Sequence, residues 1–115
     1  MQKVALVAFR GETLCFVHVM LYALDFHAKG YDVRIIMEGE ATKLVGELAR
    51  ADAPFAPLYS EISEKGLIDC VCRACSSKMG TLEEAASQGL RISGEMKGHP
   101  SMERYISEGF HILTF

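Results

Sequence analysis

The chain has 115 residues, of which 50% are hydrophobic and 23% charged, and this composition excludes a disordered or low-complexity protein. Its 12 basic and 15 acidic residues give a net charge of −3, which argues against a nucleic-acid partner because phosphate binding needs a clustered basic face. The longest apolar stretch, residues 14–24, is too short to cross a bilayer, and no signal peptide fits the N-terminus. We therefore expect one domain over residues 1–115, a cytoplasmic location and no membrane partner.

The first half of the chain alternates apolar strands with amphipathic helices. Residues 4–9 are continuously apolar, which is typical of a strand covered on both faces. Thr13 can cap a helix over 14–29, where apolar residues recur at helical spacing. A second strand follows over 33–37 and a second helix over 41–50.

The second half continues this alternation with shorter elements. They are a helix over 58–65, a strand over 67–71, a helix over 81–88, a weak strand over 90–93, a helix that begins at Pro100 or Ser101 and ends at 109, and a strand over 110–115. Strands that alternate with helices imply a parallel sheet with helices on both faces. The sequence thus predicts the α/β class.

In such a sheet, ligands and reactive groups gather beyond the carboxyl ends of the strands. The residues that this edge should collect are Arg10, Glu12 and Cys15 after the first strand, Glu38 and Glu40 after the second, Cys72 and Cys75 after the third, and His99 after the fourth.

The most informative of these residues are Cys72 and Cys75, which form a C-R-A-C pair. The order of strand, tight turn and helix start should place them near unpaired backbone N–H groups and the positive end of a helix dipole. We expect this to lower a thiol pKa below its free value of about 8.5. Cys70, inside the strand, is expected to be a small buried hydrophobe. Cytosolic thiols stay reduced, so the crowding of cysteines favours metal or redox chemistry over a structural disulfide.

The motif strand-C-x-x-C-Ser-Ser-Lys-Met-Gly resembles the signature of the DsrE/DsrF-like (DsrEFH) family, which includes YchN-like small proteins. In that family a cysteine at the end of the third strand is followed eight residues later by a glycine, and Cys72 and Gly80 hold those places here. The order of elements and the closing apolar strand over 110–115 are also similar.

The resemblance implies a three-layer α/β/α domain with a five-stranded, mostly parallel sheet, often assembled as a trimer or hexamer. It also implies a sulfur carrier or sulfurtransferase component that holds sulfane sulfur as a persulfide on Cys72, with sulfur donor and acceptor proteins as partners. The sulfur-relay subunits of that family commonly have one cysteine in the motif, whereas Cys70 and Cys75 accompany Cys72 here.

Several functions therefore stay open. In the sulfur-carrier hypothesis Cys72 and Cys75 are the reactive thiols, and Arg73, His99 and Cys15 are candidate substrate-binding residues, with no cofactor assigned. A second hypothesis is a C-x-x-C thiol-disulfide redox module. A third is a metal site in which Cys15 or His99 joins the three clustered cysteines. The last is an interaction subunit whose cysteines are inert.

Overall fold

A computed structural model describes residues 1–115 and contains one sheet of five strands, in which every pairing is parallel. The strands are β1 (Lys3–Ala8), β2 (Asp32–Met37), β3 (Ile68–Cys72), β4 (Ile92–Ser93) and β5 (His111–Thr114). Their order in the sheet is β4-β3-β2-β1-β5. The predicted α/β class and the count of five strands are confirmed.

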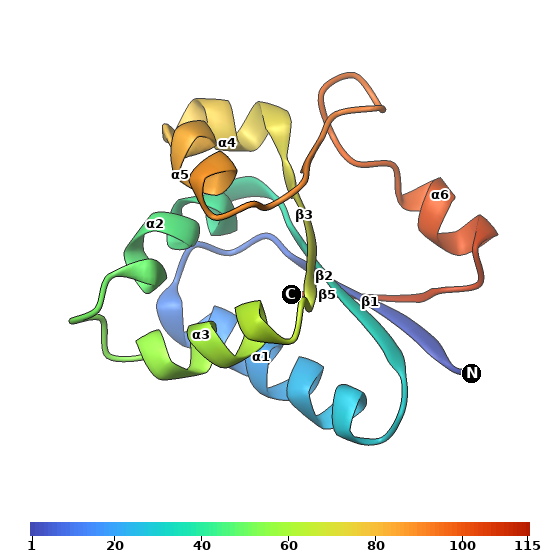
Figure 1. Ribbon diagram of the computed structural model, residues 1–115. Helices are drawn as coiled ribbons and strands as arrows, with labels where there is room; N and C mark the ends of the chain where they lie inside the picture. The colour runs from blue at the N-terminus through green and yellow to red at the C-terminus, as the bar shows by residue number, and fades with distance from the viewer.

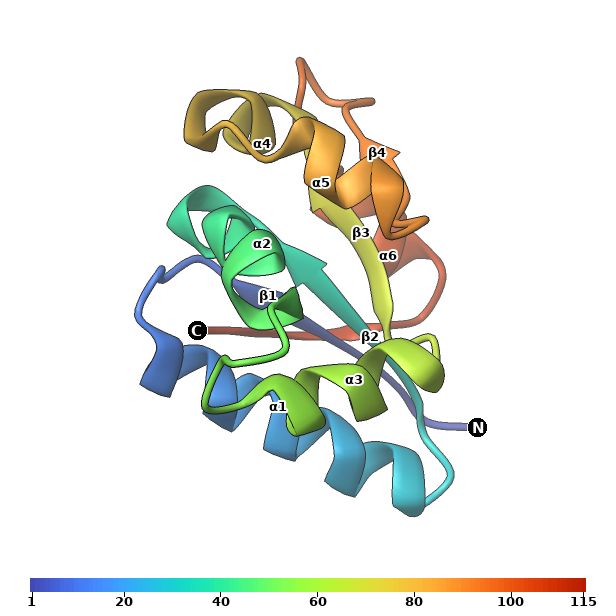
Figure 2. The same ribbon diagram turned by 60° about the vertical axis from the view of Figure 1, so that its left-hand side comes forward.

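Helices cover both faces of the sheet, which completes the predicted three layers. They are α1 (Thr13–Ala28), the 3-10 helix η1 (Gly39–Lys43), α2 (Leu44–Ala49), α3 (Ala56–Glu64), α4 (Arg73–Met79), α5 (Leu82–Ser87) and α6 (Met102–Ser107). In Figures 1 and 2, α1, α2 and α3 lie on one side of the sheet, while α6 lies on the other. None of these helices combines the length and the apolar character that a membrane-spanning helix needs.

The two faces of the sheet differ in the size of the core that they bury. A cluster of 21 buried residues, among them Leu6 and Ile35, fills the face under α1, α2 and α3. The opposite face carries a cluster of six: Ala5, Val7, Ile36, Cys70, Tyr105 and Phe110. Side chains alternate between faces along a strand, so the consecutive residues Ile35 and Ile36 pack into the two different clusters.

A bulge in β3 decides which face the cysteines occupy. Ile35 pairs with Ile68, but Ile36 pairs with Cys70, so Asp69 is an extra residue in the strand. A one-residue shift exchanges the faces of all later side chains. Cys70 therefore joins the α6 face, and by alternation Cys72 follows it there.

Several helix starts differ in detail from those predicted, and α3 begins at Ala56 rather than at residue 58. Glu12 rather than Thr13 is the N-cap of α1, and the predicted helix over 41–50 is instead η1 followed by α2. The helix predicted over 81–88 is α5, which begins at Leu82, and the hydroxyl of the preceding Thr81 donates to the backbone oxygens of Thr42 and Ser76. Ser101 does cap α6, because its Oγ accepts the N–H of Arg104 at 3.4 Å.

Candidate functional site

Four side chains from separate segments meet at the carboxyl edge of the sheet. Glu38 directly follows β2, Cys72 ends β3, Cys75 lies in the first turn of α4, and His99 lies in the loop between β4 and α6. Their sulfur, nitrogen and carboxylate oxygen atoms all lie within 4.8 Å of one another. Of the residues predicted at this edge, Glu38, Cys72, Cys75 and His99 therefore lie together, whereas Cys15, Arg10, Glu12 and Glu40 are not part of this cluster.

Cys72 is the covered member of the cluster. It is the N-cap of α4, its side chain is fully buried (0% exposed), and its Sγ accepts the N–H of Cys75 at 3.5 Å. The same sulfur lies 3.1 Å from Nδ1 of His99 and donates its S–H to the carbonyl oxygen of Gly98 at 3.6 Å. Cys72 is thus held by α4 on one side and by the His99 loop on the other.

The surroundings of Cys72 act on its pKa in the direction opposite to the one predicted. Burial, assisted by the neighbouring Glu38 carboxylate, raises the pKa of Cys72 to about 12. The hydrogen bond from the Cys75 N–H acts the other way but is outweighed. The expected lowering of this pKa is therefore wrong, because the free-energy cost of removing the thiolate from water exceeds the stabilisation that one helix N–H provides.

Cys75 is the more accessible thiol. It is half-buried, its S–H donates to Oε1 of Glu38 at 3.6 Å, and its Sγ lies 4.0 Å from Nδ1 of His99. Glu38 is buried at 8% exposure, and the one basic side chain near its carboxylate is His99, whose Nδ1 lies 3.7 Å from Oε1. The two thiols therefore lie near the same imidazole but differ in solvent exposure, because Cys75 is partly exposed and Cys72 is not.

Two tight turns fix the members of the cluster that come from loops. Gly39, directly after Glu38, has φ +52°, and a Cβ there would lie 3.0 Å from the carbonyl oxygen of Phe9. On the other side, Met96 and His99 exchange backbone hydrogen bonds around Lys97 and Gly98, which have φ 51° and 95°. Positive φ at both central residues is the geometry of a type I′ turn.

The other predicted residues lie outside this cluster. Arg73 is exposed, and its guanidinium lies against Gly94 in a hollow of about 600 Å³ that Arg91 and Arg104 also line. Cys15 is half-buried in the first turn of α1 and is not part of the four-residue cluster.

Cys70 is fully buried, as expected, but it belongs to a second polar group on the α6 face. Its Sγ lies 3.3 Å from the hydroxyl of Tyr105, which also donates to Asp69. The Asp69 carboxylate in turn pairs with Arg91 at 2.8 Å. Burial raises the pKa of the Cys70 thiol. A metal site that contains Cys70 together with Cys72 and Cys75 is therefore not formed.

Sequence reasoning gave Glu38 no role of its own. Its position could have identified it. Glu38 directly follows a buried strand and precedes a glycine, and the neighbouring strand of the sheet ends in the cysteine pair. The bond between Tyr105 and Asp69 had no such signal, because it depends on the bulge in β3.

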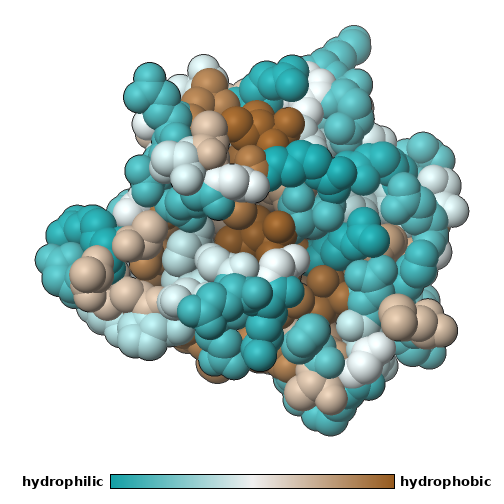
Figure 3. Space-filling model, in the orientation of Figure 1, coloured by the Kyte–Doolittle hydropathy of each residue, from teal (hydrophilic) through white to brown (hydrophobic).

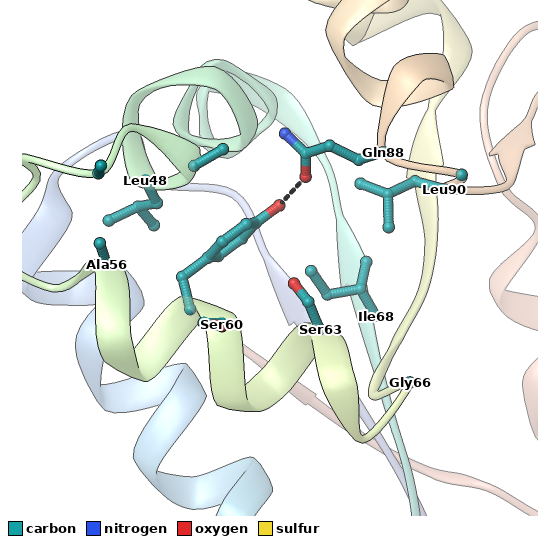
Figure 4. A pocket seen from close by; sticks show the side chains of 12 residues that line it. Leu48, Ala56, Ser60, Ser63, Gly66, Ile68, Gln88 and Leu90 are labelled. Carbon is teal, nitrogen blue, oxygen red and sulfur yellow. Dashed lines mark hydrogen bonds between the residues drawn. The ribbon is translucent and has the colours of Figure 1, made fainter.

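A second hollow lies away from the cysteines, between α2, α3 and α5. It has a volume of about 600 Å³ and shares no residue with the four-residue cluster. Figure 3 shows hydrophobic residues at its base, and Figure 4 shows its one drawn hydrogen bond, from Tyr59 to Oε1 of Gln88 at 2.7 Å. Gln88 also donates to the backbone oxygen of Val45 at 2.9 Å. The amide of Gln88 and the hydroxyl of Tyr59, which line this hollow, are therefore already engaged in hydrogen bonds within the protein.

Comparison with known proteins identifies relatives but no described activity. No protein-family model matches the chain. It is 29% identical over 96 residues to the uncharacterized protein MJ0733 of Methanocaldococcus jannaschii, covering 84% of this chain and 76% of that one. An uncharacterized protein of Archaeoglobus fulgidus is 34% identical over 41 residues, which are 36% of this chain and 67% of that protein. A second uncharacterized protein of the same organism is 40% identical over 37 residues, which are 32% of this chain and the whole of that protein.

A solved structure shares the fold. It is a conserved protein of unknown function, BT1422, from Bacteroides thetaiotaomicron, with a TM-score of 0.72 and 21% sequence identity. The match covers 99% of this chain and 95% of the other.

Proposed function

The chain belongs to one family with the short Archaeoglobus fulgidus proteins, and we propose that it is a cytoplasmic sulfur carrier whose reactive groups are Cys72 and Cys75. Sulfane sulfur enters at Cys75 and is held as a persulfide on Cys72. The observation that carries the proposal is that Nδ1 of His99 lies within 4.0 Å of both sulfur atoms. The resemblance of the motif to the DsrE/DsrF-like signature supports the same chemistry.

The difference in exposure assigns the two thiols different roles. Cys75 is half-buried and open to a donor, whereas Cys72 has no exposed surface. A donor persulfide therefore meets Cys75 first. A sulfur passed on to Cys72 is shielded from water and oxidants, which suits a group that stores sulfur until an acceptor arrives.

The first step takes sulfur from a donor persulfide, R–S–SH. Glu38 accepts the proton of the Cys75 thiol, and the Cys75 sulfur attacks the outer sulfur of the donor. A bond forms between these two sulfurs, the S–S bond of the donor breaks, and R–S⁻ leaves as R–SH after taking the proton. Cys75 then carries S–SH, and no external oxidant or reductant is consumed.

The second step moves the sulfur inward. Because its raised pKa keeps Cys72 a thiol, His99 removes the proton as the Cys72 sulfur attacks the outer sulfur of the Cys75 persulfide, so that no free Cys72 thiolate has to form first. The S–S bond at Cys75 breaks, and the Cys75 thiolate recovers a proton from His99. An acceptor thiol removes the sulfur from Cys72 by the reverse sequence.

Intact-mass spectrometry tests this proposal. The reduced protein is treated with a chelator and then with glutathione persulfide in the absence of oxygen. Wild type should gain the mass of one sulfur atom. Cys75→Ser should load roughly tenfold more slowly, because the remaining thiol is covered and access limits exchange. Cys72→Ser should still load, on Cys75, but should lose its sulfur to a small acceptor thiol faster than wild type does.

The matched control is Cys15→Ser, which removes a half-buried cysteine outside the cluster and should load like wild type. The proposal is overturned if the Cys72→Ser, Cys75→Ser double variant loads as fast as wild type. A loss of two hydrogens without any gain of sulfur would instead favour the thiol-disulfide module.

A further inference from the structure

We infer that Glu38, Cys72, Cys75 and His99 also form a binding site for one divalent transition metal of the zinc class. The inference stands on the geometry and donor chemistry of the four side chains, and it does not depend on sulfur transfer. Metal binding would occupy both thiols and so exclude sulfur loading in the same molecule.

The spacing of the four donor atoms matches a tetrahedral site. Zinc bonds of about 2.0 to 2.3 Å place the ligand atoms of a tetrahedron roughly 3.3 to 3.8 Å apart. Around His99 Nδ1, Sγ of Cys72 lies at 3.1 Å, Oε1 of Glu38 at 3.7 Å and Sγ of Cys75 at 4.0 Å. The distance from Cys75 Sγ to Glu38 Oε1 is 3.6 Å. The two remaining pairs, from Cys72 Sγ to the Cys75 and Glu38 donor atoms, lie within 4.8 Å, so side-chain shifts of up to about 1 Å would complete the site.

The donor set selects the kind of metal. Two thiols, one imidazole and one carboxylate give two soft ligands, one intermediate ligand and one hard ligand. Thiolate and imidazole favour zinc and related transition metals, whereas magnesium and calcium require oxygen ligands. With four protein ligands, the site is of the closed four-coordinate type.

The charge of the cluster also favours a cation. Glu38 is buried, yet neither a lysine nor an arginine lies within ion-pair distance of its carboxylate. Its closest partners are the Cys75 thiol and the His99 ring. A buried carboxylate is costly without a compensating positive charge, and a divalent ion between these four groups supplies that charge.

The backbone holds the ligands in place before a metal arrives. The N–H of Cys75 already points at Sγ of Cys72, and such N–H···S bonds remain available when the sulfur binds a metal. The Gly98 carbonyl accepts the N–H of Ala74 at 2.9 Å, which ties the His99 turn to the first turn of α4. Outer contacts of this kind orient metal ligands.

Titration with Co²⁺ tests the inference, because thiolate-to-cobalt charge transfer and tetrahedral d–d absorption report the ligands directly. The full chain is reduced, freed of metal with a chelator, exchanged into buffer and titrated with Co²⁺ alone. We expect both absorptions to saturate at one Co²⁺ per chain and Zn²⁺ to displace the cobalt.

Variants assign the ligands. Cys75→Ser should lose about half of the charge-transfer intensity, because one of two thiolates is gone. Glu38→Gln and His99→Ala should weaken binding at least roughly tenfold, since even outer contacts of metal sites are worth 10- to 100-fold in affinity. Cys15→Ser, the control, should bind like wild type. Circular dichroism of each chelated variant checks that it is folded.

A measurement on wild type makes the test independent of how the variants fold. Zn²⁺ should protect Cys75 from alkylation while leaving Cys15 as reactive as in the chelated protein. The inference is overturned if Co²⁺ gives no thiolate band, if the band survives unchanged in Cys75→Ser, or if Zn²⁺ leaves Cys75 alkylation unaffected. Sulfur loading is measured with chelator present, so either proposal can fail alone.

Discussion

Cys72 and Cys75 lie three residues apart, and the protein gives them different environments. Cys72 ends a buried strand and is covered by the His99 turn, whereas Cys75 lies in the first turn of α4 and is partly open. The spacing C-x-x-C identifies the pair from sequence. It does not reveal which sulfur is exposed, because that depends on the loop that closes over Cys72 from 26 residues further along the chain.

A third side chain in the same helix makes a separate prediction. Ser76 is 1% exposed, and its hydroxyl has no hydrogen-bond partner in the protein. A buried hydroxyl without a partner costs about 1 to 3 kcal/mol, and alanine is also the better helix former. Ser76→Ala should therefore raise the free energy of unfolding by about 1 kcal/mol, measured by urea denaturation.

The control for this variant is Ser77→Ala. Ser77 is exposed in the same helix, so its replacement reports the helix-propensity gain alone, about 0.5 kcal/mol. If Ser76→Ala destabilises the protein while Ser77→Ala does not, the buried hydroxyl has a partner, and the account of Ser76 is incorrect.

Among the elements, the turn over residues 96–99 has the most influence on the site, because it presents His99 to both sulfurs. Gly98 has φ +95°, and a Cβ there would lie 3.3 Å from Cβ of Ala74. Gly98→Ala should lower the free energy of unfolding by about 1 to 2 kcal/mol, the usual cost of a left-handed conformation for a residue with a Cβ. It should also weaken Co²⁺ binding.

Lys97→Asn is the matched change at the neighbouring position. Lys97 has φ 51°, and asparagine followed by glycine is the preferred pair for a type I′ turn. This variant should keep or slightly increase stability, by up to about 0.5 kcal/mol. Equal losses in Lys97→Asn and Gly98→Ala, measured by urea unfolding, would show that backbone conformation is not the cause.

The elements also show how far sequence alone could reach. The apolar runs, the helical spacings and the rule about strand ends together predicted five strands and placed Glu38, Cys72, Cys75 and His99 at one edge. The bulge at Asp69 could not be predicted, because it is visible only in the pairing of β3 with β2. The pKa of Cys72 was mispredicted for a related reason: the helix dipole follows from local sequence, but burial depends on distant segments.

For the whole molecule, the resemblance to trimeric and hexameric proteins remains a prediction, and one surface is consistent with it. β5 is an outer strand of the sheet, and its Leu113 is 42% exposed, while Tyr22 of α1 is 45% exposed. With Phe26 and Phe115 they line an apolar hollow of about 600 Å³. Exposed apolar surface of this kind often marks a subunit contact.

Light scattering at micromolar concentration should therefore give a mass three or six times the 12.7 kDa of one chain. Leu113→Lys should shift the protein toward monomer, while Ile106→Lys, at an exposed position on α6, should not. A wild-type mass of one chain would refute the prediction of a trimer or hexamer.

The central claim is that the cluster at the carboxyl edge of the sheet handles sulfur, and tryptic mapping of the sulfur-loaded wild type tests it most directly. Cleavage at Lys65, Arg73 and Lys78 separates Cys75, on residues 74–78, from residues 66–73, which carry both Cys70 and Cys72, and Cys15 lies on a third peptide. After loading with glutathione persulfide and alkylation, the added sulfur should appear on 74–78 at early times and on 66–73 later, and fragmentation of peptide 66–73 should place it on Cys72 and not on Cys70. Sulfur found on the Cys15 peptide, or on neither cysteine of the pair, would contradict the claim.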